Sequence, residues 1–284
     1  MTTKKTSKNI WDEFVFGSHL VALGDVFALY AMSVILNINV TISFFIVVYL
    51  SILAINFFNR YEDADQDAIT NPERSESVNK YLKFTPYIMV LLTVIPVGIT
   101  TYFAPISAII FMLFLFGMGI VYSIFLKNVT KRILGFKDIM TALTYALLVI
   151  FMALFYSAQI TFAVVLVTIF YFIRMFINTT FFDIKDIKSD KNAGLRTLPV
   201  ILGKNKTKQV LMILNFLSAI PILVGIYLNV LPLYSIALLV TMIYSLSYLS
   251  KRKLFTNQTT LYNVVVDGEF ILWLPYLLIG KTLL

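Results

Sequence analysis

Two clusters of asparagine and aspartate residues follow apolar segments, and their regular spacing could bring several side-chain oxygen atoms together to bind a cation. Their members are, in order, Asn59, Asp63 and Asp67, then Asp183, Asp186 and Asp190. Residues three or four apart lie on one face of a helix, so each cluster forms a column of oxygen atoms. The loops that carry the two clusters hold nine of the chain's fifteen carboxylates, so the acidic charge is concentrated there.

Such columns are unfavourable without a cation, because like charges three or four residues apart on a helix repel each other. A magnesium ion reverses the sign of that interaction. Magnesium in proteins takes one or two carboxylates, keeps several waters and fills its remaining positions with substrate phosphate. The two columns therefore predict a magnesium-assisted site for a diphosphate.

The composition is that of a membrane protein. Hydrophobic residues make up 59% of the chain and charged residues 13%, against about 45–50% and 25% in soluble domains. The absence of cysteine excludes disulfides and thiolate chemistry, and a single histidine, His19, excludes a histidine-rich metal site. The net charge of +8 is spread over short loops, so we expect no nucleic-acid partner. The first apolar segment lacks a small-residue cleavage site, so no cleavable signal peptide is expected.

Apolar runs of about 18–23 residues predict an all-α fold, with nine transmembrane helices around a central cavity and cap loops on the cytoplasmic side. The predicted spans are 18–36, 40–59, 84–103, 106–126, 138–157, 160–182, 208–228, 231–249 and 262–281. The N-terminus and the four long loops hold 21 of the 23 basic residues. The positive-inside rule places them in the cytoplasm and makes this a multi-pass protein of the cell membrane.

The acidic loops recur after the second and sixth spans. This repetition suggests one domain over residues 1–284, with two related halves at about 18–136 and 137–260 and a ninth helix behind them.

Charged and amide side chains inside the spans are costly in hydrocarbon and usually face the bundle interior. We expect Arg174 and Asn178, one turn apart, to line the floor of the cavity. Asp25 is expected to pair with Arg174 or to contact the acceptor. Asp267 and Glu269 are expected at the solvated cytoplasmic start of the ninth helix.

The two clusters resemble the motifs of the UbiA superfamily of intramembrane prenyltransferases. The first is Asn59-x3-Asp63-x3-Asp67, followed by Pro72 and Arg74. The second is Asp183-x2-Asp186-x3-Asp190, followed by Lys191, Gly194, Thr197-Leu-Pro199 and Gly203-Lys. The resemblance covers the whole chain, and the pair of motifs is more specific than either alone.

The resemblance implies an isoprenyl transfer from a polyprenyl diphosphate to an aromatic quinone precursor or a lipid, in the bilayer. Asn59, Asp63 and Asp67 would bind one Mg²⁺, and Asp186 and Asp190, assisted by Asp183, a second. Further diphosphate contacts would come from Arg74, Lys127 and Lys191. Tyr122 with Lys127 resembles the family's Tyr–Lys element. Basic side chains would stabilise the leaving group in a dry site.

The chain also departs from the usual family pattern, and the departures leave the acceptor open. Arg60 stands where the family commonly has aspartate, and Arg74-Ser75 stands in place of Arg-Pro. The alternative acceptor is a glycerol-phosphate ether lipid precursor that receives a geranylgeranyl chain. Rival classes are a transporter, whose binding groups would lie near the midplane, and a CDP-alcohol phosphotransferase, whose Asp-Gly-x2-Ala-Arg run is not found. A non-catalytic prenyl-lipid-binding protein is a third.

Overall fold

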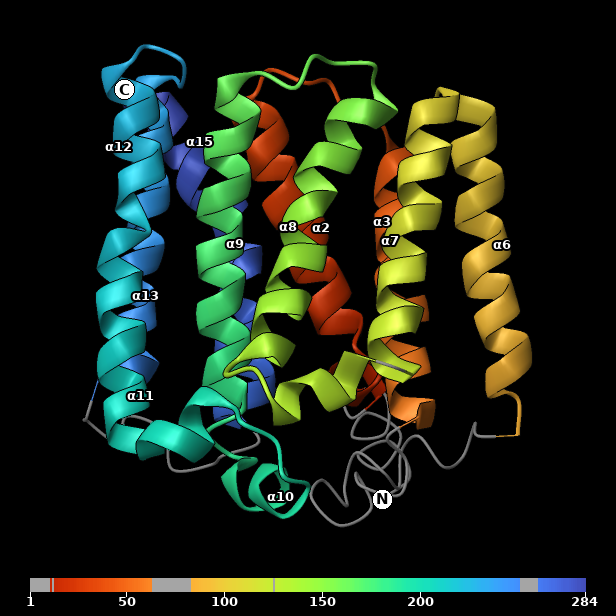
Figure 1. Ribbon diagram of the computed structural model, residues 1–284. Helices are drawn as coiled ribbons and strands as arrows, with labels where there is room; N and C mark the ends of the chain where they lie inside the picture. Colours follow the sequence, from red (N-terminus) through yellow and green to blue (C-terminus); the bar gives the residue numbers. More distant parts are fainter. Residues whose placement is uncertain (1–10, 12, 63–82, 125, 251–259) are drawn as a thin grey trace, which may run out of the picture.

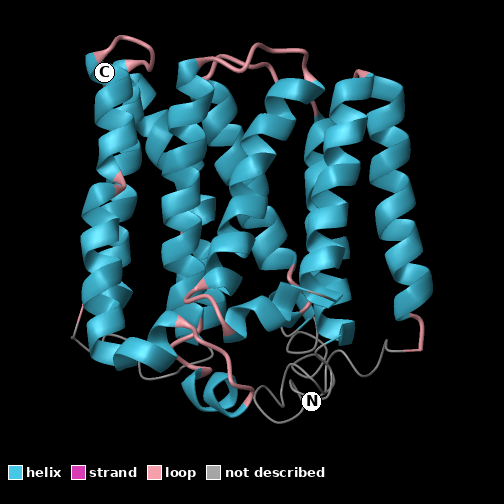
Figure 2. Cartoon of the chain, viewed as in Figure 1, coloured by secondary structure: helices cyan, strands magenta, loops and turns pink. Residues whose placement is uncertain are grey.

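The computed structural model describes residues 11, 13–62, 83–124, 126–250 and 260–284, and these are helical with no strand (Figure 2). The long helices are α2 (His19–Ile35), α3 (Ile42–Glu62), α6 (Thr85–Phe103), α7 (Ile106–Ile124), α8 (Phe136–Phe155), α9 (Phe162–Phe182) and α11 (Leu198–Leu217). The shorter elements are η1 (Leu126–Lys131), α10 (Ile187–Asn192), α12 (Ala219–Tyr227), η2 (Leu233–Leu239), α13 (Val240–Leu249), η3 (Leu261–Val266), η4 (Phe270–Leu272) and α15 (Trp273–Leu283). The predicted all-α class is confirmed.

Seven helical stretches of the described residues are long and apolar enough to cross a membrane. Two further apolar helices, His19–Ile35 and Leu233–Leu249, are shorter. Together these match the positions of the nine predicted spans. Because the two shorter helices fall below the usual length of a span, the number nine stays a prediction.

The seventh predicted span began too late. It was expected from residue 208, whereas α11 begins at Leu198. Gly203 has φ 75°, a left-handed conformation that only glycine adopts without strain, and it bends the chain inside this helix. The polar residues that follow Gly203 continue the helix, so an expectation built on apolar residues alone missed its first ten residues.

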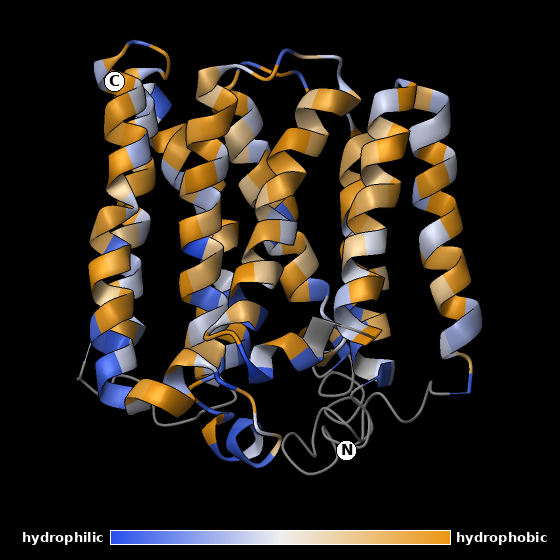
Figure 3. Ribbon diagram, viewed as in Figure 1, coloured by the Kyte–Doolittle hydropathy of each residue, from blue (hydrophilic) through white to orange (hydrophobic). Residues whose placement is uncertain are grey.

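The helices consist largely of hydrophobic residues (Figure 3), and many large apolar side chains among the described residues are exposed. Helix α6 lies at one edge of the bundle (Figure 1) and exposes Tyr87, Val90, Leu91 and Val94. Contiguous apolar surface of this extent suits contact with lipid rather than water. The side chains that face inward form the hydrophobic core shared by α2, α3, α8 and α9.

Helix α2 packs closely against the segment that contains η4. A Cβ added to Gly24 would lie 3.2 Å from Cβ of Phe270 and 3.3 Å from the carbonyl oxygen of Asp267. Small residues allow such close approach between helices in membranes. The contact at Gly24 therefore fixes the position of Asp25, its neighbour in the chain.

The second acidic cluster lies at one end of the bundle. Helix α10 is at the lower end in Figure 1, where α9 ends, and the C-terminus is at the opposite end. The side of the membrane that each end faces, and the relation of two halves, stay predictions.

Candidate functional site

A polar cavity of about 300 Å³ opens among α2, α3, α8, α9 and the last helical segment. Its polar lining residues are Ser18, Asp25, Asn56, Asn59, Lys137, Asp138, Thr141, Tyr145, Asn178, Thr179, Asp183, Lys185, Asp186, Asn263 and Asp267. Its apolar lining residues are Val15, Phe16, Val21, Met175, Phe182 and Phe270. The cavity therefore joins residues that are more than 240 positions apart in the chain.

Three predicted ligands, Asn59, Asp183 and Asp186, line this one cavity. Asn59 comes from the end of α3, and the two aspartates follow α9. The Ser123 hydroxyl donates a hydrogen bond to Oδ1 of Asn59. The structure thus brings the first and second clusters to the same site.

The other predicted diphosphate and metal ligands are placed differently. Asp63, Asp67 and Arg74 lie outside the described residues. Lys127 lies in η1, and its side chain is also outside the described part. Lys191 is exposed on α10 and does not line the cavity.

Tyr122 is half-buried in α7, with its ring centroid 6.4 Å from that of Phe136. It is near enough to Lys137 and Asp183 to interact with both electrostatically, although it is not a lining residue. Tyr122 therefore lies next to the polar cavity and does not line it.

Lys137 and Asp138 at the start of α8 were missed by the sequence analysis. Nζ of Lys137 lies 2.7 Å from Oδ1 of Asp183 in an ion pair. Asp138 is buried, and the Thr180 hydroxyl donates a 3.1 Å hydrogen bond to its Oδ2. The signal available in the sequence was a Lys–Asp pair at the beginning of an apolar helix, of which Lys137 was included only among the basic residues of a loop and Asp138 fell inside the predicted span 138–157.

Two buried carboxylate oxygens at this site have no hydrogen-bond partner among the described residues, Oδ2 of Asp183 and Oδ1 of Asp138. A buried carboxylate oxygen without a partner is costly. With the amide oxygen of Asn59, these atoms form a set of hard oxygen donors of the kind that Mg²⁺ prefers. The chemical type of these donors therefore suits a magnesium ion, although the described residues alone contain no group of three acidic, histidine or cysteine side chains that could hold one.

Asp190 is buried beside this set, and the Thr197 hydroxyl donates a 3.3 Å hydrogen bond to its Oδ2. Burial raises the pKa of the Asp190 carboxyl to about 6, and the Lys137 ammonium opposes that rise. Asp183 and Asp186 raise it further, because their charges repel a third carboxylate. The second cluster is thus a place where added positive charge is favourable.

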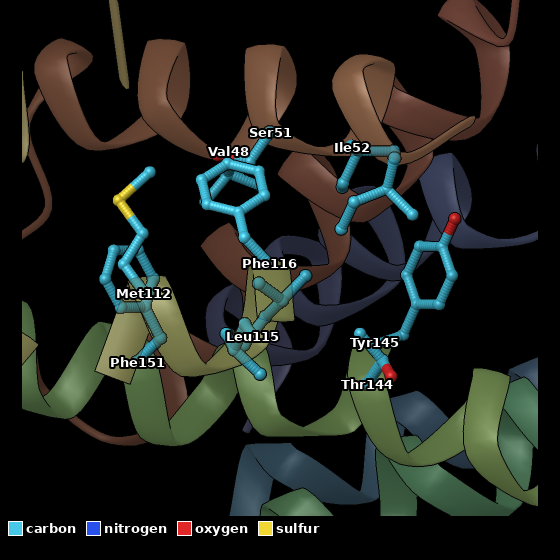
Figure 4. Close-up of a pocket in the computed structure, with 11 residues that line it drawn as sticks. Val48, Ser51, Ile52, Met112, Leu115, Phe116, Thr144, Tyr145 and Phe151 are labelled. Atoms are coloured by element: carbon cyan, nitrogen blue, oxygen red, sulfur yellow. The ribbon is translucent and has the colours of Figure 1, made fainter. Parts of the chain in front are cut away.

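An apolar groove of about 40 Å³ adjoins the cavity between α3, α7 and α8 (Figure 4). Its lining residues are Val48, Ser51, Ile52, Ile55, Met112, Leu115, Phe116, Thr144, Tyr145, Leu148 and Phe151. Tyr145 lines both spaces, and its hydroxyl accepts a 3.2 Å hydrogen bond from Nδ2 of Asn56. The tyrosine therefore marks the boundary between a polar and an apolar compartment.

Asp25 also lines the polar cavity. It is 1% exposed, and the Tyr171 hydroxyl donates a hydrogen bond to its Oδ1. The Asp267 carboxylate is near enough to interact with it electrostatically and lines the same cavity. Asn178 also lines the cavity and donates a 3.2 Å hydrogen bond to the carbonyl oxygen of Val266.

Arg174 does not line the cavity and does not pair with Asp25, so both expectations for it were wrong. It is fully enclosed behind the cavity, where it forms an ion pair with Glu269 and donates to Asn215 and Ser245. Glu269, expected in solvent, is 2% exposed and also accepts a 2.6 Å hydrogen bond from the Tyr248 hydroxyl. An arginine in the bundle interior needs a buried carboxylate, because an unpaired charge there is too costly.

Comparison with known proteins agrees with this geometry. The model of the UbiA prenyltransferase family matches residues 20–266. A digeranylgeranylglyceryl phosphate synthase of Pyrococcus horikoshii is 39% identical over 62 residues, which are 20% of this chain and 22% of that protein. The aligned part thus spans less than a quarter of that relative.

Three solved structures share the fold. A UbiA homologue from Archaeoglobus fulgidus bound to DMAPP and Mg²⁺ gives a TM-score of 0.68 at 15% identity, over 96% of this chain and 100% of that chain. An apo UbiA homologue from Aeropyrum pernix gives 0.67 at 14% identity, over 93% and 97%. A digeranylgeranylglyceryl phosphate synthase gives 0.62 at 16% identity, over 98% and 100%. With the apolar spans, these likenesses make the chain an integral membrane protein.

Proposed function

This chain belongs to the UbiA prenyltransferase family, and we propose that it transfers an isoprenyl chain from a prenyl diphosphate to a hydroxyl-bearing lipid, with release of diphosphate. One observation carries the proposal. A single cavity brings together Asn59 of the first motif and Asp183 and Asp186 of the second, and it borders an apolar groove. A prenyl diphosphate needs both environments, because its head is anionic and its tail is hydrocarbon.

The diphosphate would lie at the Asp183 end of the cavity. We assign the metal ligands to Asn59, Asp63, Asp67, Asp183, Asp186 and Asp190, as two ions would require. Mg²⁺ when bound supplies Lewis-acid stabilisation of the leaving diphosphate. Arg74, Lys127 and Lys191 would add charge from the loops. Lys137 is the basic side chain that the structure places directly at Asp183, so it would contact the diphosphate as well.

The prenyl tail would lie in the apolar groove, with Tyr145 at its entrance. Hydrocarbon burial contributes about 0.8 kcal/mol per methylene, so the groove would stabilise the part of the tail that enters it. The enclosed cavity would also keep water from the allylic carbon, where an attacking water would give a prenyl alcohol instead of product. The aromatic face of Tyr145 is suitably placed to stabilise positive charge on that carbon.

For the acceptor we favour a glyceryl phosphate ether with one free hydroxyl. The 39% identical stretch shared with a digeranylgeranylglyceryl phosphate synthase supports this choice. The acidic wall of the cavity, with Asp25 and Asp267, also disfavours an acceptor that presents a carboxylate there. We further propose that the acidic loops face the cytoplasm, as the distribution of basic residues indicates.

The direct test is product analysis. The purified protein is incubated with Mg²⁺, labelled geranylgeranyl diphosphate and one acceptor at a time: a monogeranylgeranylglyceryl phosphate, 4-hydroxybenzoate or a dihydroxynaphthoate. The proposal predicts a labelled diether from the lipid acceptor. Prenylation of an aromatic acceptor alone would overturn the lipid assignment, and no labelled product from any acceptor would overturn the transferase assignment.

A further inference from the structure

The polar cavity contains a buried carboxylate that the diphosphate site does not use. Asp25 is 1% exposed, lines the cavity and has one oxygen, Oδ2, without a hydrogen-bond partner among the described residues. Its other oxygen accepts the hydrogen bond from Tyr171. A buried oxygen of this kind suits a ligand that donates a hydrogen bond.

The depth of Asp25 separates it from the diphosphate end. Its partner Tyr171 is twelve residues before Asp183 on α9, which is about 18 Å along the helix axis. The allylic carbon of the donor and the hydroxyl oxygen of the acceptor would lie next to each other in the cavity, between the diphosphate and Asp25.

Two elements hold the position of Asp25. Tyr171 binds it from α9, and the close contact at Gly24 locks α2 against the backbone of Asp267 and the side chain of Phe270. A carboxylate fixed in this way has a defined orientation, which proton transfer from a bound hydroxyl requires. The Asp267 carboxylate adds negative potential that favours a hydrogen-bond donor over an anion at this wall.

We propose that Asp25 is the general base that accepts the proton of the acceptor's hydroxyl, with Tyr171 as its positioning residue. This inference rests on the proposed function. In the step, the hydroxyl oxygen forms a bond to the allylic carbon as that carbon's bond to the diphosphate oxygen breaks. The O–H proton passes to Oδ2 of Asp25, and the bonding pair leaves with the diphosphate. The protonated carboxyl then loses its proton to solvent when the products leave the cavity.

The test compares Asp25→Asn with Ser33→Ala, a control on the same helix. Ser33 is buried, donates to the carbonyl oxygen of Tyr30 and does not line the cavity. Transfer to monogeranylgeranylglyceryl phosphate should fall by about 100-fold or more in Asp25→Asn and stay near wild type in Ser33→Ala. Mg²⁺-dependent binding of a non-reactive thiolodiphosphate analogue of the donor should be unchanged in both. Tyr171→Phe should lose about tenfold in transfer with normal donor binding, since one hydrogen bond to a charged carboxylate is removed.

A second arm does not depend on turnover. With the donor analogue bound, wild-type protein should bind the free hydroxyl lipid more tightly than its methyl ether, and Asp25→Asn should bind the two equally. Near-normal transfer by Asp25→Asn, a parallel loss of donor binding, or equal wild-type affinity for lipid and ether would each overturn the role of Asp25. Failure of the proposed function is a different result, namely no lipid product from the wild-type protein even though it distinguishes the hydroxyl from the ether.

Discussion

Nζ of Lys137 lies 2.7 Å from Oδ1 of Asp183, so a lysine from the start of α8 meets the first aspartate of the second motif. The ammonium also interacts with Asp138 and Asp190, which places one positive charge among three carboxylates. A cation or diphosphate bound at Asp183 would therefore lie beside the Lys137 ammonium. Lys137 therefore links the occupancy of the acidic cluster to the position of α8.

Replacement of Lys137 by methionine should weaken the binding of prenyl diphosphate. A charge-assisted hydrogen bond contributes about 1.5–3 kcal/mol, so the expected loss is about tenfold or more in donor affinity. Lys206→Met is a suitable control, because Lys206 is exposed on α11 and does not line the cavity. Equilibrium binding of labelled geranylgeranyl diphosphate in Mg²⁺ would measure both variants, and equal affinity in the two would contradict a role of Lys137 in donor binding.

The apolar groove should determine which donor lengths are accepted. Met112→Trp would fill the groove from α7, and we expect transfer from geranylgeranyl diphosphate to fall more than transfer from geranyl diphosphate. Overpacking of a closed apolar site costs about 1–3 kcal/mol, which corresponds to a change in preference of about tenfold.

The adjacent residue provides the control for this test, because Leu113 is 53% exposed on the outer side of α7. Leu113→Trp should leave the ratio of the two rates unchanged. If Met112→Trp also leaves that ratio unchanged, the tail does not lie in this groove.

The buried pair of Arg174 and Glu269 should stabilise the bundle rather than act on substrate. Arg174→Met leaves Glu269 buried without its cation, and breaking such a pair costs about 3–5 kcal/mol. Adding Glu269→Leu removes the second charge, so the double variant should unfold at a higher temperature than Arg174→Met alone. Thermal unfolding in detergent would measure this. A double variant less stable than Arg174→Met would show that the buried Glu269 charge does not become destabilising when its partner Arg174 is removed.

The parts of the fold that the sequence predicted well are those that depend on apolar length. All nine predicted apolar segments overlap helical elements. In the hydrocarbon of a membrane, backbone N–H and C=O groups have no water to bond to, so they must bond to each other within a helix. The start of α11 was missed, since the bend at Gly203 and the polar turn after it carry no apolar signal. Helix length in polar regions depends on backbone conformation that hydropathy does not report.

The candidate site was predictable only where a repeated spacing marked it. Asn59, Asp183 and Asp186 were identified from their periodicity, and the structure places them in one cavity. Lys137 and Asp138 have no such repetition and enter the site only through the packing of α8 against α9. Arg174 was assigned to the cavity from its neighbour Asn178, but residues four apart on a helix still differ in direction, and Arg174 turns towards Glu269.

The central claim is that the two acidic motifs jointly bind a diphosphate through Mg²⁺, and donor binding tests it most directly without any acceptor. Labelled geranylgeranyl diphosphate is titrated onto the purified protein with Mg²⁺ and with a chelator, and the titration is repeated for Asp63→Asn and Asp186→Asn. Binding should require Mg²⁺ and should weaken by about 100-fold in each variant, because each variant loses a charged metal ligand. Binding that is equally tight in chelator, or unchanged in both variants, would contradict the central claim.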